Sequence, residues 1–253
     1  MELVGGGNKV ELIEVNSRQE AEYCAYKDSK ENDFYYLHPS DHIETIAGAG
    51  TVCFESLEEI HQKSGIIIDD IFASCGGGGL VAGCFIAAGA FFRNIVDNGQ
   101  FVENINVIAC EPDNANDGYI SFNNKKIHQL QYSPDTVADG LRALSVSKLA
   151  FKYIKYIKDF ILLKEEEIEE YTSIINNITS LKIETSAAIS FAGVIKYINN
   201  KRNLDTKIDT NILSQIKFAD IKNIDEYKYI QDQHRNKRKN ILVILSGGNA
   251  DNI

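Results

Sequence analysis

Long apolar runs are scarce in this sequence, and we expect none of them to cross a membrane. The longest apolar run, Leu80–Phe92, is interrupted only by small residues and stops at Arg93, short of the roughly 20 residues that a membrane span needs. We interpret it as a buried helix. The first thirty residues contain five glutamates and no positively charged start followed by an apolar stretch. We therefore see no secretory signal and expect a cytoplasmic protein.

Positive charge is also scarce. The chain has 26 lysines and arginines against 36 aspartates and glutamates, which gives a formal net charge of −10. Such a surface repels nucleic-acid phosphates and anionic lipids, so we expect neither as a partner. We interpret the basic cluster His234–Lys239 as solvated surface beside a buried strand. With 253 residues, 44% of them hydrophobic, the chain has the composition of a globular protein with one or at most two cores.

The cysteines form no C-x-x-C pair. There are five of them, widely spaced in apolar or strand-like contexts: Cys24, Cys53, Cys75, Cys84 and Cys110. An odd number without close pairs argues against a zinc or redox centre. We expect buried, reduced thiols, because free cysteine usually behaves as a small hydrophobic residue.

Continuous apolar segments alternate with helical patterns along most of the chain. We predict strands at Ile66–Ser74, Asn106–Cys110, Asp159–Leu163 and Ile241–Leu245. Strands that are apolar throughout and separated by helices indicate a parallel sheet covered on both faces. The prediction is therefore an α/β fold. Residues 203–240 are dense in Asp, Lys and Asn, and we interpret them as a polar insertion.

The first part of the chain has shorter patterns. Val10–Val15 alternates apolar and acidic residues like a half-exposed strand, and Phe34–Leu37 is a second short strand candidate. Between them, Ser17–Lys27 has an N-cap serine followed by an Ala/Glu-rich stretch, which predicts a helix.

Glycine is concentrated in runs. Nine of the 18 glycines lie in Gly5–Gly7, Gly76–Gly79 and Gly247–Gly248. The second run closes one predicted strand and opens the helix Leu80–Phe92, so its amides would lie unobstructed at the positive end of the helix dipole. Such a site suits a phosphate. The spacing is neither G-x-G-x-x-G nor a P-loop. A merely flexible turn is the alternative interpretation.

Seven short motifs occur in one order along the chain. They are His38-Pro-Ser-Asp41, Ile46-Ala-Gly-Ala-Gly-Thr51, Ser74-Cys-Gly-Gly-Gly-Gly-Leu80, Glu111-Pro-Asp-Asn-Ala-Asn-Asp117, Thr136-Val-Ala-Asp-Gly140, Glu184-Thr-Ser186 and Leu245-Ser-Gly-Gly-Asn249. Together they resemble the serine racemase and threonine dehydratase family, pyridoxal-phosphate enzymes of the tryptophan-synthase-β fold (fold type II). The resemblance covers nearly the whole chain apart from the insertion. It implies a mostly parallel sheet with helices on both faces in residues 51–253, and it makes residues 1–50 the remnant of a smaller α/β lobe. It also implies serine or threonine as the substrate, and a homodimer.

The same resemblance assigns a cofactor site. It implies that the amides of Gly76, Gly77, Gly78, Gly79 and Leu80 hold the cofactor phosphate. Ser246 matches the family's hydroxyl beside the pyridine nitrogen, and a neutral partner leaves that nitrogen largely unprotonated. Glu184 matches a residue near the ring edge, although Thr185 replaces the proline that commonly follows. The alternative interpretations are that Ser246 simply caps a turn and that Glu184 is a buried glutamate paired to the backbone.

A divalent-cation site is implied as well. Glu111, the carbonyl of Ala115 and Asp117 match it, and their hard oxygen ligands suit Mg²⁺ or Ca²⁺. An Asp/Asn-rich turn is the alternative. The stretch from Glu111 is similar to the racemase branch, but Lys148 stands where that branch has an asparagine and Ala143 matches the dehydratase branch. The branch is therefore left open.

No catalytic residue is assigned. The family's Schiff-base lysine and its Ser-Gly-Asn-His type loop lie upstream of the point corresponding to Met1, and Lys9 precedes a strand that matches another part of the family. Without a fixed amine, pyridoxal phosphate would bind only as a ligand, and racemisation or dehydration would not proceed on this chain alone. Three hypotheses follow. In the first, the chain is the carboxy-terminal portion of an enzyme that a separate amino-terminal part completes. In the second, it is a pseudoenzyme or remnant that binds pyridoxal phosphate, a divalent ion or a full-length relative, and in the third it is an unrelated phosphate-binding α/β module.

Overall fold

The computed structural model describes residues 12–98, 104–179, 181–202 and 239–247. The chain divides into two compact units, Met1–His38 and Pro39–Ile253. This division falls earlier than the predicted boundary at residue 50. The reason is that residues 43–50 are the first turns of helix α2 (Ile43–Ser64), which packs within the second unit.

The first unit contains helix α1 (Arg18–Glu31). Its predicted N-cap is confirmed, because the Ser17 side chain accepts a hydrogen bond from the Glu20 amide at 3.2 Å. The two predicted strands are wrong where they are described, since residues 12–15 and 34–37 are irregular. A short strand needs a neighbour to pair with, and the described part of this unit offers none. Lys9 and Gly5–Gly7 lie outside the described residues.

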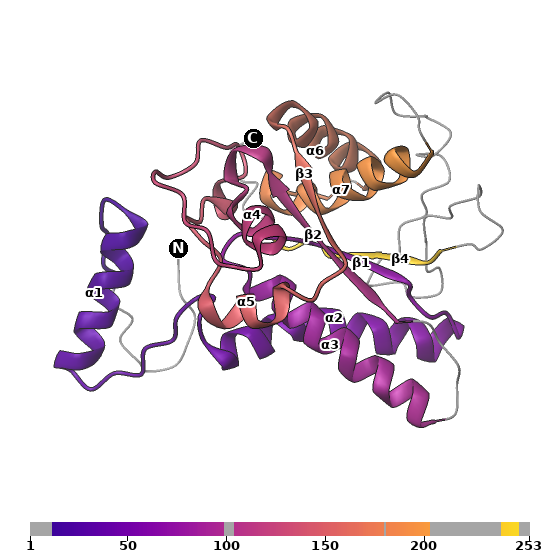
Figure 1. The fold of residues 1–253 in the computed structure, drawn as a ribbon, viewed down its shortest axis with the longest axis horizontal. Helices are drawn as coiled ribbons and strands as arrows, with labels where there is room; N and C mark the ends of the chain where they lie inside the picture. Colours follow the sequence, from indigo (N-terminus) through magenta and orange to yellow (C-terminus); the bar gives the residue numbers. More distant parts are fainter. Residues whose placement is uncertain (1–11, 99–103, 180, 203–238, 248–253) are drawn as a thin grey trace. The chain divides into compact units, whose positions relative to one another are not determined.

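A four-stranded parallel sheet forms the centre of the second unit (Figure 1). Its strands are β1 (Asp70–Ser74), β2 (Asn106–Pro112), β3 (Asp159–Leu163) and β4 (Ile241–Val243), in the order β3-β2-β1-β4. Phe72 lies opposite Ile108 on one side and Val243 on the other. All four predicted strands are present, although β1 begins at Asp70 instead of Ile66 and β4 ends at Val243 instead of Leu245. Every residue of β1 is buried, as a central parallel strand requires.

Helices cover both faces of the sheet, as predicted (Figure 1). One layer contains α2, α3 (Gly79–Asp97) and α5 (Lys148–Ile154), and the other contains α6 (Glu165–Thr179) and α7 (Thr185–Arg202). Successive strand residues point to opposite faces. Accordingly, Ile71 and Ala73 join the hydrophobic cluster of the first layer, whereas Phe72 joins that of the second. Short helices η1 (Asp113–Ala115) and α4 (Asp117–Asn124) follow β2, and η2 (Asp139–Leu141) lies between α4 and α5.

Helices α2 and α3 pack closely at two glycines. A Cβ atom at Gly50 would lie 2.7 Å from the Gly83 carbonyl oxygen, and one at Gly83 would lie 2.6 Å from the Gly50 nitrogen. Within the described ranges, α3 is the one helix that could cross a membrane by length and composition, and half of its apolar window is buried. Its contacts with α2, α5, β1 and β2 are those of a core helix.

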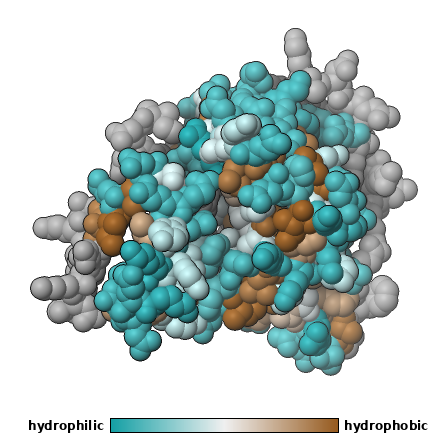
Figure 2. Space-filling model, turned by 60° about the vertical axis from the view of Figure 1, so that its left-hand side comes forward, coloured by the Kyte–Doolittle hydropathy of each residue, from teal (hydrophilic) through white to brown (hydrophobic). Residues whose placement is uncertain are grey.

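The character of the surface and the burial of the cysteines largely agree with what the composition predicts. On the face shown in Figure 2, hydrophilic side chains predominate and hydrophobic ones form separate patches. All five cysteines are free; four are buried as predicted, and Cys24 is partly exposed. Of the predicted insertion 203–240, only Lys239 and Asn240 are among the described residues.

Candidate functional site

The glycine run Gly76–Gly79 joins β1 to α3. Gly78 is the N-cap of α3 with φ of 85°, a left-handed conformation that glycine adopts without strain. A Cβ atom on Gly78 would overlap the Ile154 side chain. The first amides of a helix have no partner within that helix. The run is therefore a tightly packed turn that leads into these amides at the positive end of the α3 dipole.

A serine from the start of the second unit lies against this loop. A Cβ atom on Gly77 would lie 2.5 Å from Ser40 Oγ. The Ser40 carbonyl accepts a hydrogen bond from Ser147 Oγ at 2.8 Å, and the Ser147 amide donates to the Gly77 carbonyl at 3.0 Å. Asp41 accepts from the Leu149 amide at 2.7 Å. The motif around Ser40 thus packs on the glycine loop through the first turn of α5. Sequence reasoning assigned Ser40 no role.

Ser246 follows β4, the strand that pairs with β1. Its Oγ lies 3.2 Å from Oγ of Ser74, the last residue of β1. Ser74 is two residues before the glycine loop, so the loop and Ser246 lie at the carboxyl ends of neighbouring parallel strands. Ligands of open α/β sheets bind at this edge. Ser246 is partly exposed there.

Two further predicted motifs reach the same edge. A Cβ atom on Gly247 would collide with the Glu184 carboxylate, which places this side chain against the backbone after Ser246. The Gly140 amide donates to Ser186 Oγ at 3.0 Å. A Cβ atom on Gly76 would lie 3.3 Å from the Gly140 carbonyl oxygen. The segments at Ser40, Gly140 and Ser147 therefore contact the loop, and Glu184 lies against Gly247, the residue after Ser246.

Two buried carboxylates lie at the end of β2. Glu111 is fully buried and Asp117, the first residue of α4, is 1% exposed. Glu111 Oε2 accepts a hydrogen bond from the Tyr119 amide at 2.9 Å. Glu111 Oε1 and Asp117 Oδ2 are buried and find no hydrogen-bond donor among the described residues. Buried polar atoms without partners usually mark a missing ligand or a strained site.

The electrostatics of this pair follow from its burial. Burial raises the pKa of Asp117 to about 7. Burial, and then the charge of Asp117, raise the pKa of Glu111 well above its usual range. Hydrogen bonds from the Tyr119 amide, the Cys75 thiol and the Gly118 amide oppose this shift. Two unpartnered carboxylate oxygens fit a hard divalent cation. In the part of the chain that the structure describes, no three His, Cys, Asp or Glu side chains gather to hold a metal, so a cation would also need oxygens from backbone or water.

The other site residues named in the sequence analysis lie in or beside the short helices and α3. Leu80 lies in the first turn of α3 and packs, partly buried, on the core. Ala115 ends η1 and is buried close before Asp117. Lys148 begins α5 with an exposed side chain, and Ala143 is buried.

Comparison with known proteins identifies the family. The model of the family described as "Pyridoxal-phosphate dependent enzyme" matches residues 1–213. The chain belongs to this family. The resemblance predicted from the seven motifs is therefore confirmed, and so is the fold that it implied.

Individual family members show how much of the chain is shared. Serine racemase of Dictyostelium discoideum is 30% identical over 217 residues, which are 85% of this chain and 52% of the relative. L-threo-3-hydroxyaspartate ammonia-lyase of Saccharomyces cerevisiae is 29% identical over 166 residues, 65% of this chain and 46% of the relative. The crystal structure of a threonine deaminase from T.th. has a TM-score of 0.62 and 27% identity, covering 71% of this chain and 61% of that one. The chain spans about half the length of the two curated relatives.

Proposed function

We propose that this chain binds pyridoxal phosphate at the carboxyl ends of β1 and β4. The amides of Gly76, Gly77, Gly78, Gly79 and Leu80 hold the phosphate, and Ser246 faces the pyridine nitrogen. The observation that supports this most is the 3.2 Å distance between Ser246 Oγ and Ser74 Oγ. This distance places the Ser246 hydroxyl beside β1, the strand that leads into the glycine loop.

The chain's own residues have distinct tasks in this proposal. The amides at the start of α3 bind an anion because they lack helical partners and lie at the positive end of the dipole. Ser246 orients the ring without giving it a full positive charge, because a hydroxyl is neutral. When bound, the cofactor supplies an electron sink for bonds at the α-carbon of an amino acid.

The proposed reaction class is racemisation or dehydration of a small amino acid, with serine or threonine as the substrate. Its support is the similarity to proteins named serine racemase, ammonia-lyase and threonine deaminase. We assign no cofactor-linking lysine. Lys239, which precedes β4, is held at the opposite end of the sheet by Asp70, with Nζ 2.8 Å from Oδ2. We propose that these residues bind the cofactor without a covalent bond.

We also propose that Glu111, the Ala115 carbonyl and Asp117 hold Mg²⁺ or Ca²⁺. The two buried carboxylate oxygens without donors among the described residues support this assignment. The raised pKa of Asp117, about 7, is the state expected of a buried carboxyl group without a cation, because burial penalises its charged form.

Titration of the full chain with pyridoxal phosphate tests the site. We expect saturable quenching of tyrosine fluorescence, and Ser246→Ala to weaken binding about two- to tenfold, the range of one neutral hydrogen bond. Ser56→Ala is the matched control, because Ser56 Oγ donates a hydrogen bond to the Val52 carbonyl within α2. No saturable binding, or equal affinity of Ser246→Ala and the unaltered chain, would contradict the assignment.

Borohydride reduction of the same mixture tests the absence of a covalent bond. We expect no stoichiometric reduced adduct on any lysine in the peptide masses. One specifically labelled lysine would refute the non-covalent proposal while leaving the phosphate and ring contacts unaffected.

A further inference from the structure

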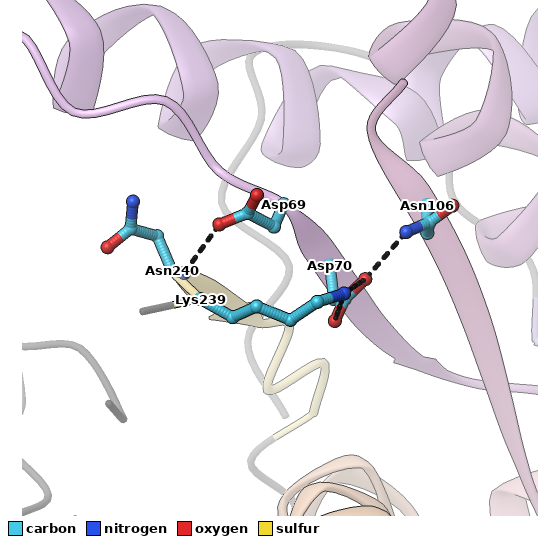
Figure 3. Close-up of polar contacts among 5 residues, drawn as sticks. All are labelled: Asp69, Asp70, Asn106, Lys239 and Asn240. Carbon is cyan, nitrogen blue, oxygen red and sulfur yellow. Dashed lines mark hydrogen bonds and ion pairs between the residues drawn. The ribbon is translucent and has the colours of Figure 1, made fainter. Parts of the chain in front are cut away.

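A partly buried ion pair joins three strands at the amino end of the sheet (Figure 3). Asp70, the first residue of β1, is fully buried. Its carboxylate lies 2.8 and 3.0 Å from Lys239 Nζ and accepts a hydrogen bond from Asn106 Nδ2 at 2.7 Å. Asn106 begins β2, and Lys239 lies two residues before β4. One carboxylate therefore links β2, β1 and β4.

Asn240, the next residue toward β4, is also hydrogen-bonded to the segment around Asp69. The Asn240 amide donates to Asp69 Oδ2 at 2.7 Å (Figure 3). Asn240 Nδ2 donates to the Ile67 carbonyl at 2.9 Å, and the Asn240 carbonyl accepts from the Asp69 amide at 2.9 Å. Lys239 and Asn240 are thus tied to the start of β1 by side chains as well as by backbone.

Strand β4 needs such an anchor. It has three residues, paired as Asp70 with Ile241 through Phe72 with Val243. So short a ladder offers few backbone hydrogen bonds to define its register. A slip of one residue moves a strand by about 3.3 Å and turns every side chain to the opposite face of the sheet. Ser246, three residues beyond Val243, would then leave Ser74.

We propose that Asp70 and Lys239 are positioning residues that set the register of β4 and thereby hold Ser246 beside the glycine loop. A slip would separate Lys239 from Asp70 and leave a buried carboxylate unpaired, which is strongly unfavourable. Ile244, the residue after β4, makes a further contact that fits the same register, since its carbonyl accepts a hydrogen bond from Ser190 Oγ at 2.8 Å. The functional part of this inference rests on the proposed cofactor site.

The first test needs no cofactor. In a Ser74→Cys/Ser246→Cys parent, oxidation links the two positions, and mass spectrometry of the joined peptides identifies the bond. We expect Lys239→Met to slow this link at least about fivefold, because slipped registers separate the two side chains. Asp70→Asn/Lys239→Met is the second variant. In this variant the residue at position 70 is uncharged. The ion pair is therefore absent, but no buried charge is left without a partner.

Lys196→Met is the matched control. It removes an ion pair of similar length and exposure, with Lys196 Nζ 2.7 Å from Glu167 Oε2 and the lysine side chain 25% exposed against 33% for Lys239. That pair joins α7 to α6, so linkage should match the parent.

The second test compares two ligands. Inorganic phosphate probes only the loop, whereas pyridoxal phosphate also probes Ser246. We expect Lys239→Met to weaken pyridoxal phosphate binding about two- to tenfold, as Ser246→Ala does, and to leave phosphate affinity unchanged. The Ser246→Ala/Lys239→Met double variant should lose no more than either single variant.

The outcomes separate the two proposals. If the unaltered chain does not bind pyridoxal phosphate, the proposed function fails and the linkage rates alone decide the inference. Parent-like linkage in both ion-pair variants, or no linkage in the parent, overturns the positioning role. Additive losses of affinity in the double variant do so as well.

Discussion

Gly78 is the most constrained position of the loop between β1 and α3, and alanine there should destabilise the fold. Its φ of 85° costs an L-residue about 1–2 kcal/mol. The added Cβ would overlap Ile154 Cδ1 and lie 3.2 Å from Ala150 Cβ. Ile154 is fully buried and cannot move into solvent. Overpacking of this kind costs about 1–3 kcal/mol. We expect Gly78→Ala to lose about 2–5 kcal/mol in total.

Urea denaturation followed by circular dichroism measures this loss. Gly79→Ala is the matched control, because its Cβ would meet no atom closer than 3.4 Å and alanine favours the helix that begins there. It should be as stable as the unaltered chain or slightly more so. A Gly78→Ala variant within about 0.5 kcal/mol of the unaltered chain would refute the packing argument.

The remaining predictions concern the buried carboxylates and the α2–α3 contact. Asp117 titrates near 7 when folded and near 3.8 when unfolded, so the folded state binds the extra proton between these values. Stability in metal-free buffer should therefore fall by up to about 4 kcal/mol from pH 4 to pH 7; Asp117→Asn should flatten this dependence in urea titrations. At pH 8, Ca²⁺ should raise the melting temperature of the unaltered chain but not of Asp117→Asn. Gly83→Ala should cost about 2–5 kcal/mol in thermal unfolding, because its Cβ would lie 2.6 Å from the Gly50 nitrogen. Gly89→Ala, with nothing within 4 Å, should cost nothing.

The sequence predicted the sheet because its strands carry a strong local signal. Phe160–Leu163 is an apolar run, and the strand that contains it is confirmed with the predicted bounds Asp159–Leu163. The segments near residues 12 and 34 showed that a similar local pattern is insufficient, since a strand also needs a partner. The glycine loop could be located for the same local reason: a strand, four glycines and a helix are contiguous in the chain.

The contacts that complete the site were not predictable in this way. Ser74 and Ser246 are separated by 172 residues, and Asp70 and Lys239 by 169. Hydrophobic periodicity along the sequence gives no information about pairs that are so far apart. The order of parallel strands could have indicated the serines, because each comes after a predicted strand and the ends of parallel strands gather at one edge. The ion pair had no such signal, since Lys239 looked like the end of a solvated basic cluster.

Register and stability should be separable at this ion pair. Burying the Asp70 carboxylate and part of Lys239 costs desolvation energy, and replacing such a pair with apolar residues is often neutral or stabilising. Asp70→Leu/Lys239→Met should therefore retain or raise the urea midpoint, provided that Asn106 turns its amide toward solvent. The same variant lacks the charge that penalises a slipped β4, so linkage between cysteines at positions 74 and 246 should slow. If midpoint and linkage fall together, the pair contributes to stability alone, and the backbone of β4 sets its own register.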